Sequence, residues 1–334
     1  MRVQFLSFIA CTAVACTSHV GGYSENDAGS PDVVGEPDAD LSTLTCETEF
    51  ANVTLEPMPP TVNVLVDASG SMTRDFGGLS RWRAVERALV DPTVGVVSRL
   101  ASDVSFGATV FHSDNGHLGG TCPRMSSVVP IADNADAVRQ LIADSEPHGD
   151  TPTSEAIGVL TTELAPLNTS YRTILLLATD GNPDNCNGPD QHTLFSQVLT
   201  ENAVDQAYAA GVETIVLSVG TDATMEHLQR VANLGSGQPV HTGAAPYYIA
   251  TDPDELVTAF EAMISDVIPT CVFQHGLMVT MDQAEAGTIW VDGLELDYGM
   301  DWTWVDPSAI ELLGNACGLV LGDDSVTVEG EFPC

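Results

Sequence analysis

From residue 61 onward, apolar segments with the composition of buried strands alternate with segments that have the periodicity of helices. Continuous apolar runs rich in β-branched residues are typical of strands covered on both faces. Strands are expected at 61–66, 103–111, 172–181, 212–220 and 247–250, with an antiparallel edge strand at 126–132. Helices are expected at 81–89, 134–144, 151–164, 194–210, 224–235 and 252–265. This order predicts an α/β fold: a doubly wound, mostly parallel sheet with helices on both faces.

The alternation of strand and helix patterns stops after Cys271. Short strand-like segments separated by turns follow, at 276–281, 287–296, 301–306, 309–314 and 325–332. We therefore expect residues 271–334 to form a small, disulfide-linked, β-rich appendage to a main domain at 61–270. Its tryptophans, Trp290, Trp302 and Trp304, are interpreted as core residues of this unit rather than as a sugar-binding platform.

The charge balance excludes several classes of function. The chain has 334 residues, with 47 acidic and 10 basic side chains and a formal net charge of −37. Every basic side chain is an arginine, so a phosphate-binding loop with its lysine is absent and lysine chemistry is excluded. Clustered cations are also missing, and we therefore expect no nucleotide and no nucleic acid as a partner.

The N-terminal segment has the features of an export signal. Residues 1–16 combine one arginine with a short apolar stretch, which is too short to span a bilayer. The sequence Ala13-Val14-Ala15-Cys16 resembles a bacterial lipobox, which implies a lipid anchor on Cys16 in the cell envelope; plain secretion with cleavage nearby is the alternative. Residues 17–60 carry nine acidic residues and are expected to form a disordered linker.

Oxygen-bearing side chains follow two of the expected strands and open one helix. Asp67, Ser69 and Ser71 come directly after the strand at 61–66, Thr151 opens a helix, and Asp180 ends the strand at 172–181. Ligands of open α/β sheets bind beyond the carboxyl ends of the strands. Hydroxyl and carboxylate oxygens suit hard cations, with Mg²⁺ expected first and Mn²⁺ or Ca²⁺ as alternatives.

This pattern resembles the metal-ion-dependent adhesion site of von Willebrand factor type A (vWA) domains, including those of bacterial lipoproteins, over about residues 61–268. The resemblance implies that Ser69, Ser71 and Thr151 are direct ligands. It also implies that Asp67 and Asp180 balance the charge, directly or through water. One coordination position then stays open for a carboxylate of a protein partner.

Further acidic residues lie near these segments. Asp150 stands where many vWA domains have a neutral residue, and it adds negative charge if it faces the ion. Asp75, Asp114 and Asp184 are interpreted as solvated carboxylates around the site.

An enzyme is not expected. His112, His117 and His148 have unlike spacings and are interpreted as loop residues. A triad of Ser69, His112 and Asp114 lacks the GxSxG turn of a nucleophile elbow.

Six cysteines remain after the signal, as expected for disulfides in an exported chain. Six cysteines allow fifteen pairings. From the order of elements we expect the pairs Cys122–Cys186, Cys46–Cys271 and Cys317–Cys334.

The leading hypothesis is an extracytoplasmic, lipid-anchored adhesion or binding protein that uses a divalent cation. The alternative is a structural or assembly module of the envelope in which the metal loop stabilises the fold. The sequence leaves the identity of the partner open.

Overall fold

The computed structural model describes residues 50–114, 120–167, 173–187, 194–265, 267, 271–321 and 326–333. The expected signal segment, Cys16, and the part of the expected linker before residue 50 lie outside these residues. Within the described ranges, no helix has both the length and the apolarity needed to cross a bilayer.

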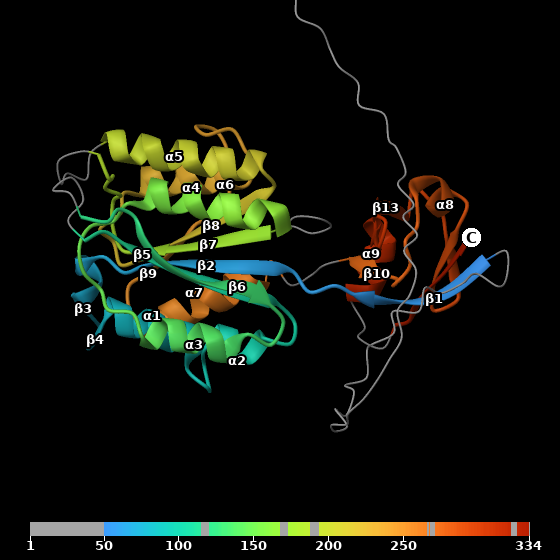
Figure 1. Ribbon diagram of the computed structural model, residues 1–334, viewed down its shortest axis with the longest axis horizontal. Coiled ribbons are helices and arrows are strands. Elements are labelled where there is room, and N and C mark those ends of the chain that lie inside the picture. The colour runs from blue at the N-terminus through green and yellow to red at the C-terminus, as the bar shows by residue number, and fades with distance from the viewer. Residues whose placement is uncertain are drawn as a thin grey trace, which may run out of the picture. The chain divides into compact units, whose positions relative to one another are not determined.

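A six-stranded mixed sheet forms the centre of the main domain (Figure 1). Its strands, in spatial order, are β6 (Arg124–Ile131), β5 (Ser105–His112), β2 (Thr61–Asp67), β7 (Thr173–Thr179), β8 (Val212–Val219) and β9 (Tyr248–Ala250). All neighbours are parallel except β6, which pairs antiparallel with β5 at the edge. The predicted parallel strands and the antiparallel edge strand are confirmed.

Helices cover both faces of this sheet (Figure 1). One layer contains α1 (Arg81–Val90), α2 (Val96–Leu100), α3 (Ala135–Ala143) and α7 (Pro253–Ser265). The other contains α4 (Thr153–Leu164), α5 (Leu194–Ala209) and α6 (Met225–Gly235). Alternate strand residues contribute to two separate cores, because successive side chains of a strand point to opposite faces.

Local sequence explains where α1 begins. The Ser80 hydroxyl accepts a hydrogen bond from the backbone N–H of Arg83, which satisfies one of the free donors of the first turn. Trp82, Val85 and Leu89 then fall on one helical face and are buried. The helix therefore packs against the sheet through a continuous apolar stripe.

A second, seven-stranded antiparallel sheet is built from both ends of the described chain. Its order is β12 (Leu294–Leu296), β11 (Thr288–Val291), β15 (Val328–Pro333), β1 (Phe50–Pro57), β10 (Val272–Gln274), β14 (Ala309–Leu312) and β13 (Trp302–Asp306). The expected linker at 17–60 is therefore wrong for residues 50–57. This strand pairs with β15 over Phe50–Leu55 and with β10 over Glu56–Pro57.

The interior of the second sheet contains Trp302, which is fully buried against Phe332. The strand expected at 309–314 is confirmed as β14 over Ala309–Leu312, and α9 (Gly314–Leu321) follows it. The segment 276–281, which was expected to be a strand, is not one, and α8 (Met281–Glu285) begins at its last residue. The Thr280 hydroxyl and the Gln283 side chain form a capping box, which explains why a helix begins there.

Two disulfides lie within the described residues. The expected Cys122–Cys186 bond is confirmed. Cys271 pairs with Cys317, so the expected partners of these two cysteines, Cys46 and Cys334, are wrong. The physical reason is strand order: β10 pairs with β14, and α9 follows β14 directly, so the chain returns Cys317 to Cys271. Cys46 and Cys334 themselves lie outside the described residues.

Candidate metal centre

Strand pairing brings the predicted oxygen donors to one edge of the six-stranded sheet. β2 and β7 are parallel neighbours with Val66 opposite Ala178, so Asp67 and Asp180 leave the sheet on the same side. The backbone N–H of Gly70 donates to the carbonyl of Gly149 at 2.9 Å, which ties the loop after β2 to the segment before Thr151. Three segments that are distant in sequence therefore meet here.

A chain of short hydrogen bonds joins the two serines to Asp180. The hydroxyl oxygens of Ser69 and Ser71 lie 2.9 Å apart, and Ser71 Oγ donates to Asp180 Oδ1 at 2.7 Å. Ser69 and Asp180 are buried and Ser71 is partly exposed. These three side chains thus form a continuous row of oxygen atoms, and Ser71 is its partly exposed member.

Asp67 is a fully buried carboxylate without a cationic partner among the described residues. Its Oδ1 accepts from the backbone N–H of Ser69, and its Oδ2 accepts from the Thr179 hydroxyl, both at 2.8 Å. Burial, and then the negative charge of Asp180, raise the pKa of Asp67 to about 6, although the two hydrogen bonds oppose this rise. A cation bound near Asp67 would favour the charged form of this carboxylate.

Asp180 has a cationic neighbour that sequence reasoning missed. Nη1 of Arg81, in the first turn of α1, donates to Asp180 Oδ2 at 2.7 Å and to Asp222 Oδ2 at 3.0 Å. Arg81 is 7% exposed. The position of Arg81 at the start of a helix could have revealed this pairing. A cation in the first turn is unfavourable beside the positive end of the helix dipole, so it needs an anionic partner.

Ser71, Thr151 and Asp180 open into a shared cavity of about 350 Å³. Its other lining residues are Arg74, Gly181, Asn182 and Asp222. Thr151 is buried, and its carbonyl accepts from the backbone N–H of Asp184 at 2.9 Å. This bond joins the start of α4 to the chain that follows β7.

Gly149 fixes the approach of this segment to β5. Its φ is +70°, and a Cβ at this position would lie 1.6 Å from the carbonyl oxygen of Ser113. The carboxylate of the next residue, Asp150, accepts from the Ser113 hydroxyl at 3.0 Å. The Asp150 carboxylate is thus hydrogen-bonded to Ser113 at the end of β5, and its contribution to the charge of the metal site stays a prediction.

The donor set fits a hard divalent cation. Hydroxyl and carboxylate oxygens are the ligands that Mg²⁺, Mn²⁺ and Ca²⁺ prefer. Asp67 and Asp180 are both buried carboxylates, but Arg81 pairs with Asp180 and Asp222 and not with Asp67. Buried charges are stable when they are paired or bound to a metal. The residues present therefore leave negative charge for a cation to balance.

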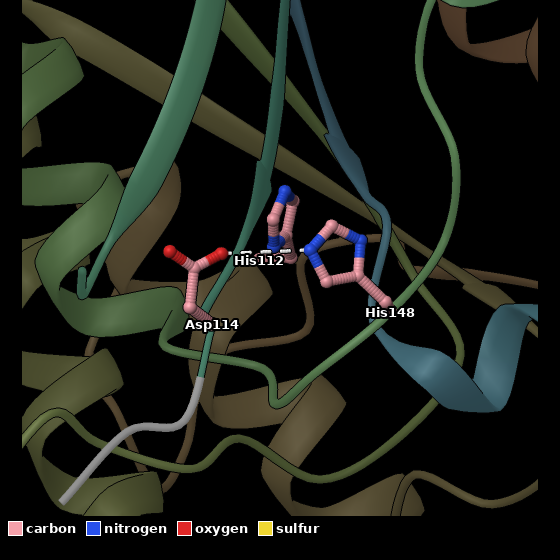
Figure 2. Close-up of side chains that lie close together, drawn as sticks. All are labelled: His112, Asp114 and His148. Carbon is pink, nitrogen blue, oxygen red and sulfur yellow. Dashed lines mark ion pairs between the residues drawn. The ribbon is translucent and has the colours of Figure 1, made fainter. Parts of the chain in front are cut away.

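A second polar cluster lies at the end of β5. The structure brings His112, Asp114 and His148 together, although their spacing in sequence led us to treat the histidines as separate loop residues (Figure 2). One potential ligand atom from each lies within 4.8 Å of those of the other two. The third histidine of that prediction, His117, lies outside the described residues.

Comparison with known proteins gives a limited result. No family model matches this chain, and no curated protein is significantly similar to it in sequence. The solved structure of the pilus adhesin SpaC from Lactobacillus rhamnosus GG is 18% identical, with a TM-score of 0.49, and the match covers 85% of this chain and 40% of the adhesin.

Two further solved structures are similar at a lower level. The PilB minor pilin from Streptococcus sanguinis is 15% identical with a TM-score of 0.41, over 64% of this chain and 63% of the pilin. Proximal thread matrix protein 1 from the mussel byssus, with a zinc-occupied MIDAS motif, is 16% identical with a TM-score of 0.44, over 65% of this chain and 50% of that protein. Each of these three TM-scores is below 0.5, so these similarities assign no function to this chain.

Proposed function

We propose that this chain is an exported binding protein that engages a protein partner through a divalent cation. The proposed ligands are Asp67, Ser69, Ser71, Thr151 and Asp180. The observation that carries the proposal is the buried pair of carboxylates, Asp67 and Asp180, of which Asp180 alone is paired with a cation among the described residues.

The vWA resemblance and the site geometry support the same reading. The serine hydroxyls, Ser69 and Ser71, lie between the two carboxylates, and Thr151 lines the same cavity as Ser71. Mg²⁺ is proposed first, and Mn²⁺ or Ca²⁺ are the alternatives. A cation bound mainly by neutral oxygens keeps a strong attraction for an anionic oxygen from outside.

The partner is proposed to be a protein that presents a carboxylate to this cavity. The net charge of −37 repels acidic partners at long range. Arg74 lines the cavity, and its side chain is 62% exposed while it pairs with Asp222 at 2.6 Å. It places a positive charge beside the proposed open position, and physiological salt screens more distant charges.

An envelope location is proposed on independent grounds. Two disulfides, Cys122–Cys186 and Cys271–Cys317, are typical of chains that mature in an oxidising compartment. Attachment to a membrane is proposed through a lipid on Cys16, with no nucleotide or nucleic acid involved.

Calorimetric titration with Mg²⁺, Mn²⁺ and Ca²⁺ tests the ligand assignment. Wild type should bind one cation, and Ser71→Ala and Asp67→Ala should lose at least about tenfold in affinity, since each removes an oxygen donor. Asp75→Asn is the matched control, because this exposed carboxylate follows the same loop. Equal cation affinity in wild type and in both site variants would contradict the assignment of these residues as ligands.

A capture experiment from the native envelope separates adhesion from a structural role. Immobilised wild type should retain a protein partner that EDTA releases and that Ser71→Ala fails to retain. A partner retained equally with EDTA and by Ser71→Ala indicates instead an assembly module in which the metal loop serves stability.

A further inference from the structure

We propose that His112, Asp114 and His148 form a second cation site, specific for a divalent transition metal of the zinc type. Two imidazoles and one carboxylate are typical zinc ligands, with a fourth position left for water. This donor set differs in kind from the all-oxygen set of Asp67 and its neighbours. The second site is thus independent of the proposed adhesion function.

The separation of the ligand atoms suits coordination by one small ion. His148 Nε2 lies 3.5 Å from Asp114 Oδ1, and all three potential ligand atoms lie within 4.8 Å of one another. Ligands about 2.0–2.1 Å from a tetrahedral zinc ion are about 3.4 Å apart. In Figure 2, the imidazole of His112 lies beside the line that joins Asp114 to His148. Small side-chain movements therefore complete the site.

His148 is held in the orientation that a ligand needs. Its Nδ1 lies 3.0 Å from the carbonyl oxygen of Glu146, and a carbonyl can only accept, so Nδ1 carries the proton. Nε2, on the other side of the ring, faces Asp114 at 3.5 Å and can offer its lone pair to a metal ion that lies between them. A second hydrogen bond of this kind, which fixes the tautomer and the ring, regularly accompanies metal-binding histidines.

His112 supplies a second, independent observation. This side chain is 9% exposed, and its Nδ1 has no hydrogen-bond partner among the described residues. A buried imidazole nitrogen without a partner is unfavourable unless a ligand satisfies it.

The Asp114 carboxylate is shared with a competing cation. Nη1 of Arg124 donates a hydrogen bond to each of its two oxygens at 2.9 Å. The Arg124 side chain is 57% exposed and is free to turn toward solvent when a metal binds Asp114. Arg124 therefore competes with a metal ion for Asp114 without blocking the site. Replacing this arginine tests whether Asp114 is a ligand.

A metal at this position would clip two neighbouring segments together. His112 is the last residue of β5, and the backbone N–H of His148 donates to the carbonyl of Ala68, one residue after β2. The clipped segment continues through Gly149 to Thr151. Zinc would thus hold the start of the loop that carries Thr151.

The test is zinc titration of the metal-stripped full chain in excess Mg²⁺, followed by calorimetry and metal analysis, with Co²⁺ absorption reporting nitrogen ligation. Wild type should bind one zinc ion tightly, and His148→Gln and Asp114→Asn should each weaken binding at least about 100-fold. Both residues are accessible to solvent, so circular dichroism should show folded variants. His241→Gln, at another exposed histidine, is the matched control and should bind as wild type does.

Two further variants distinguish this site from the proposed adhesion site and from a simple ion pair. Ser71→Ala should leave tight zinc binding intact, and Arg124→Gln should strengthen it because a competing cation is removed. Zinc binding that survives His148→Gln and Asp114→Asn, or that disappears in Ser71→Ala, would overturn the proposal. Weaker binding in Arg124→Gln would also count against it.

Discussion

Arg81 Nη1 donates to Asp180 Oδ2 at 2.7 Å while the other oxygen of Asp180 accepts from a serine hydroxyl, so one carboxylate joins a buried arginine to the candidate metal centre. We predict that Arg81→Met lowers the metal-free free energy of unfolding by about 3–5 kcal/mol, because Asp180 becomes an unpaired buried charge. Saturating Mg²⁺ should restore more stability to the variant than to wild type, since the cation then supplies the lost positive charge.

Urea unfolding with EDTA and with Mg²⁺ checks this prediction. Arg83→Met is the matched control, because this arginine lies in the same helix with a side chain that is 64% exposed. Its unfolding free energy should change by less than about 0.5 kcal/mol. An equal response of both variants to Mg²⁺ would contradict the role assigned to Arg81.

The raised pKa of Asp67 predicts a pH-dependent stability in the metal-free protein. The folded state holds the Asp67 proton up to a pH of about 6, whereas the ordinary pKa of an aspartate side chain is 3.8. Stability from this group is therefore complete below pH 3.8 and is lost as the pH rises through about 6. Over that range, the unfolding free energy of wild type should fall by about 3 kcal/mol relative to Asp67→Asn, which cannot ionise.

Denaturant unfolding of both proteins in EDTA, from pH 4 to pH 7, measures this difference. The pH dependence that arises from the other acidic groups is common to both proteins and therefore cancels in the comparison. Saturating Mg²⁺ should abolish the fall, because a bound cation favours the charged carboxylate. A constant difference across the range in EDTA would show that Asp67 titrates normally.

Gly149 predicts a sharp contrast between two glycine substitutions. Gly149→Ala should destabilise the fold by more than about 1 kcal/mol and weaken cation binding, because φ is +70° and the new Cβ would strike the Ser113 carbonyl. Gly158→Ala, in α4 with nothing within 4 Å of its Cβ, should stabilise by about 0.5–1 kcal/mol. Thermal unfolding and Mg²⁺ titration of both variants give the comparison, and similar behaviour of the two would refute it.

The Cys271–Cys317 bond predicts a specific peptide map. Proteolysis without reduction should release one peptide pair joined through these cysteines. Replacing both by serine should lower the unfolding free energy by about 4 kcal/mol, because the bond closes a loop with a sequence separation of 46. A linked pair containing Cys317 and Cys334 would contradict the structure.

Local pattern was sufficient to predict the main sheet and the positions of the oxygen donors. The apolar run at 61–66 predicts a strand that is covered on both faces. Asp67, Ser69 and Ser71 follow this run directly, so their position at the end of a strand could be predicted from the local sequence. Thr151 and Asp180 could be added because parallel strands end at a common edge. The structure brings all five to that edge, and their role as ligands stays a prediction.

The remaining features depend on contacts between distant residues, which local pattern does not encode. β1 resembles linker in sequence because it follows an acidic segment and Leu55 is its one buried residue, and it becomes a strand because β15 and β10 flank it. In the same way, strand order joins Cys271 to Cys317.

By itself, the sequence determined the alternation of strands and helices, the acidic and lysine-free surface, and the oxygen donors at the strand ends, because each depends on residue type and short spacing. Tertiary structure alone decided that Arg81 meets Asp180 and that His112 meets His148. Arg81 and Asp180 are 99 positions apart and become partners only because the fold places their segments side by side. Once such groups are buried together, the charge of each affects the pKa of the other.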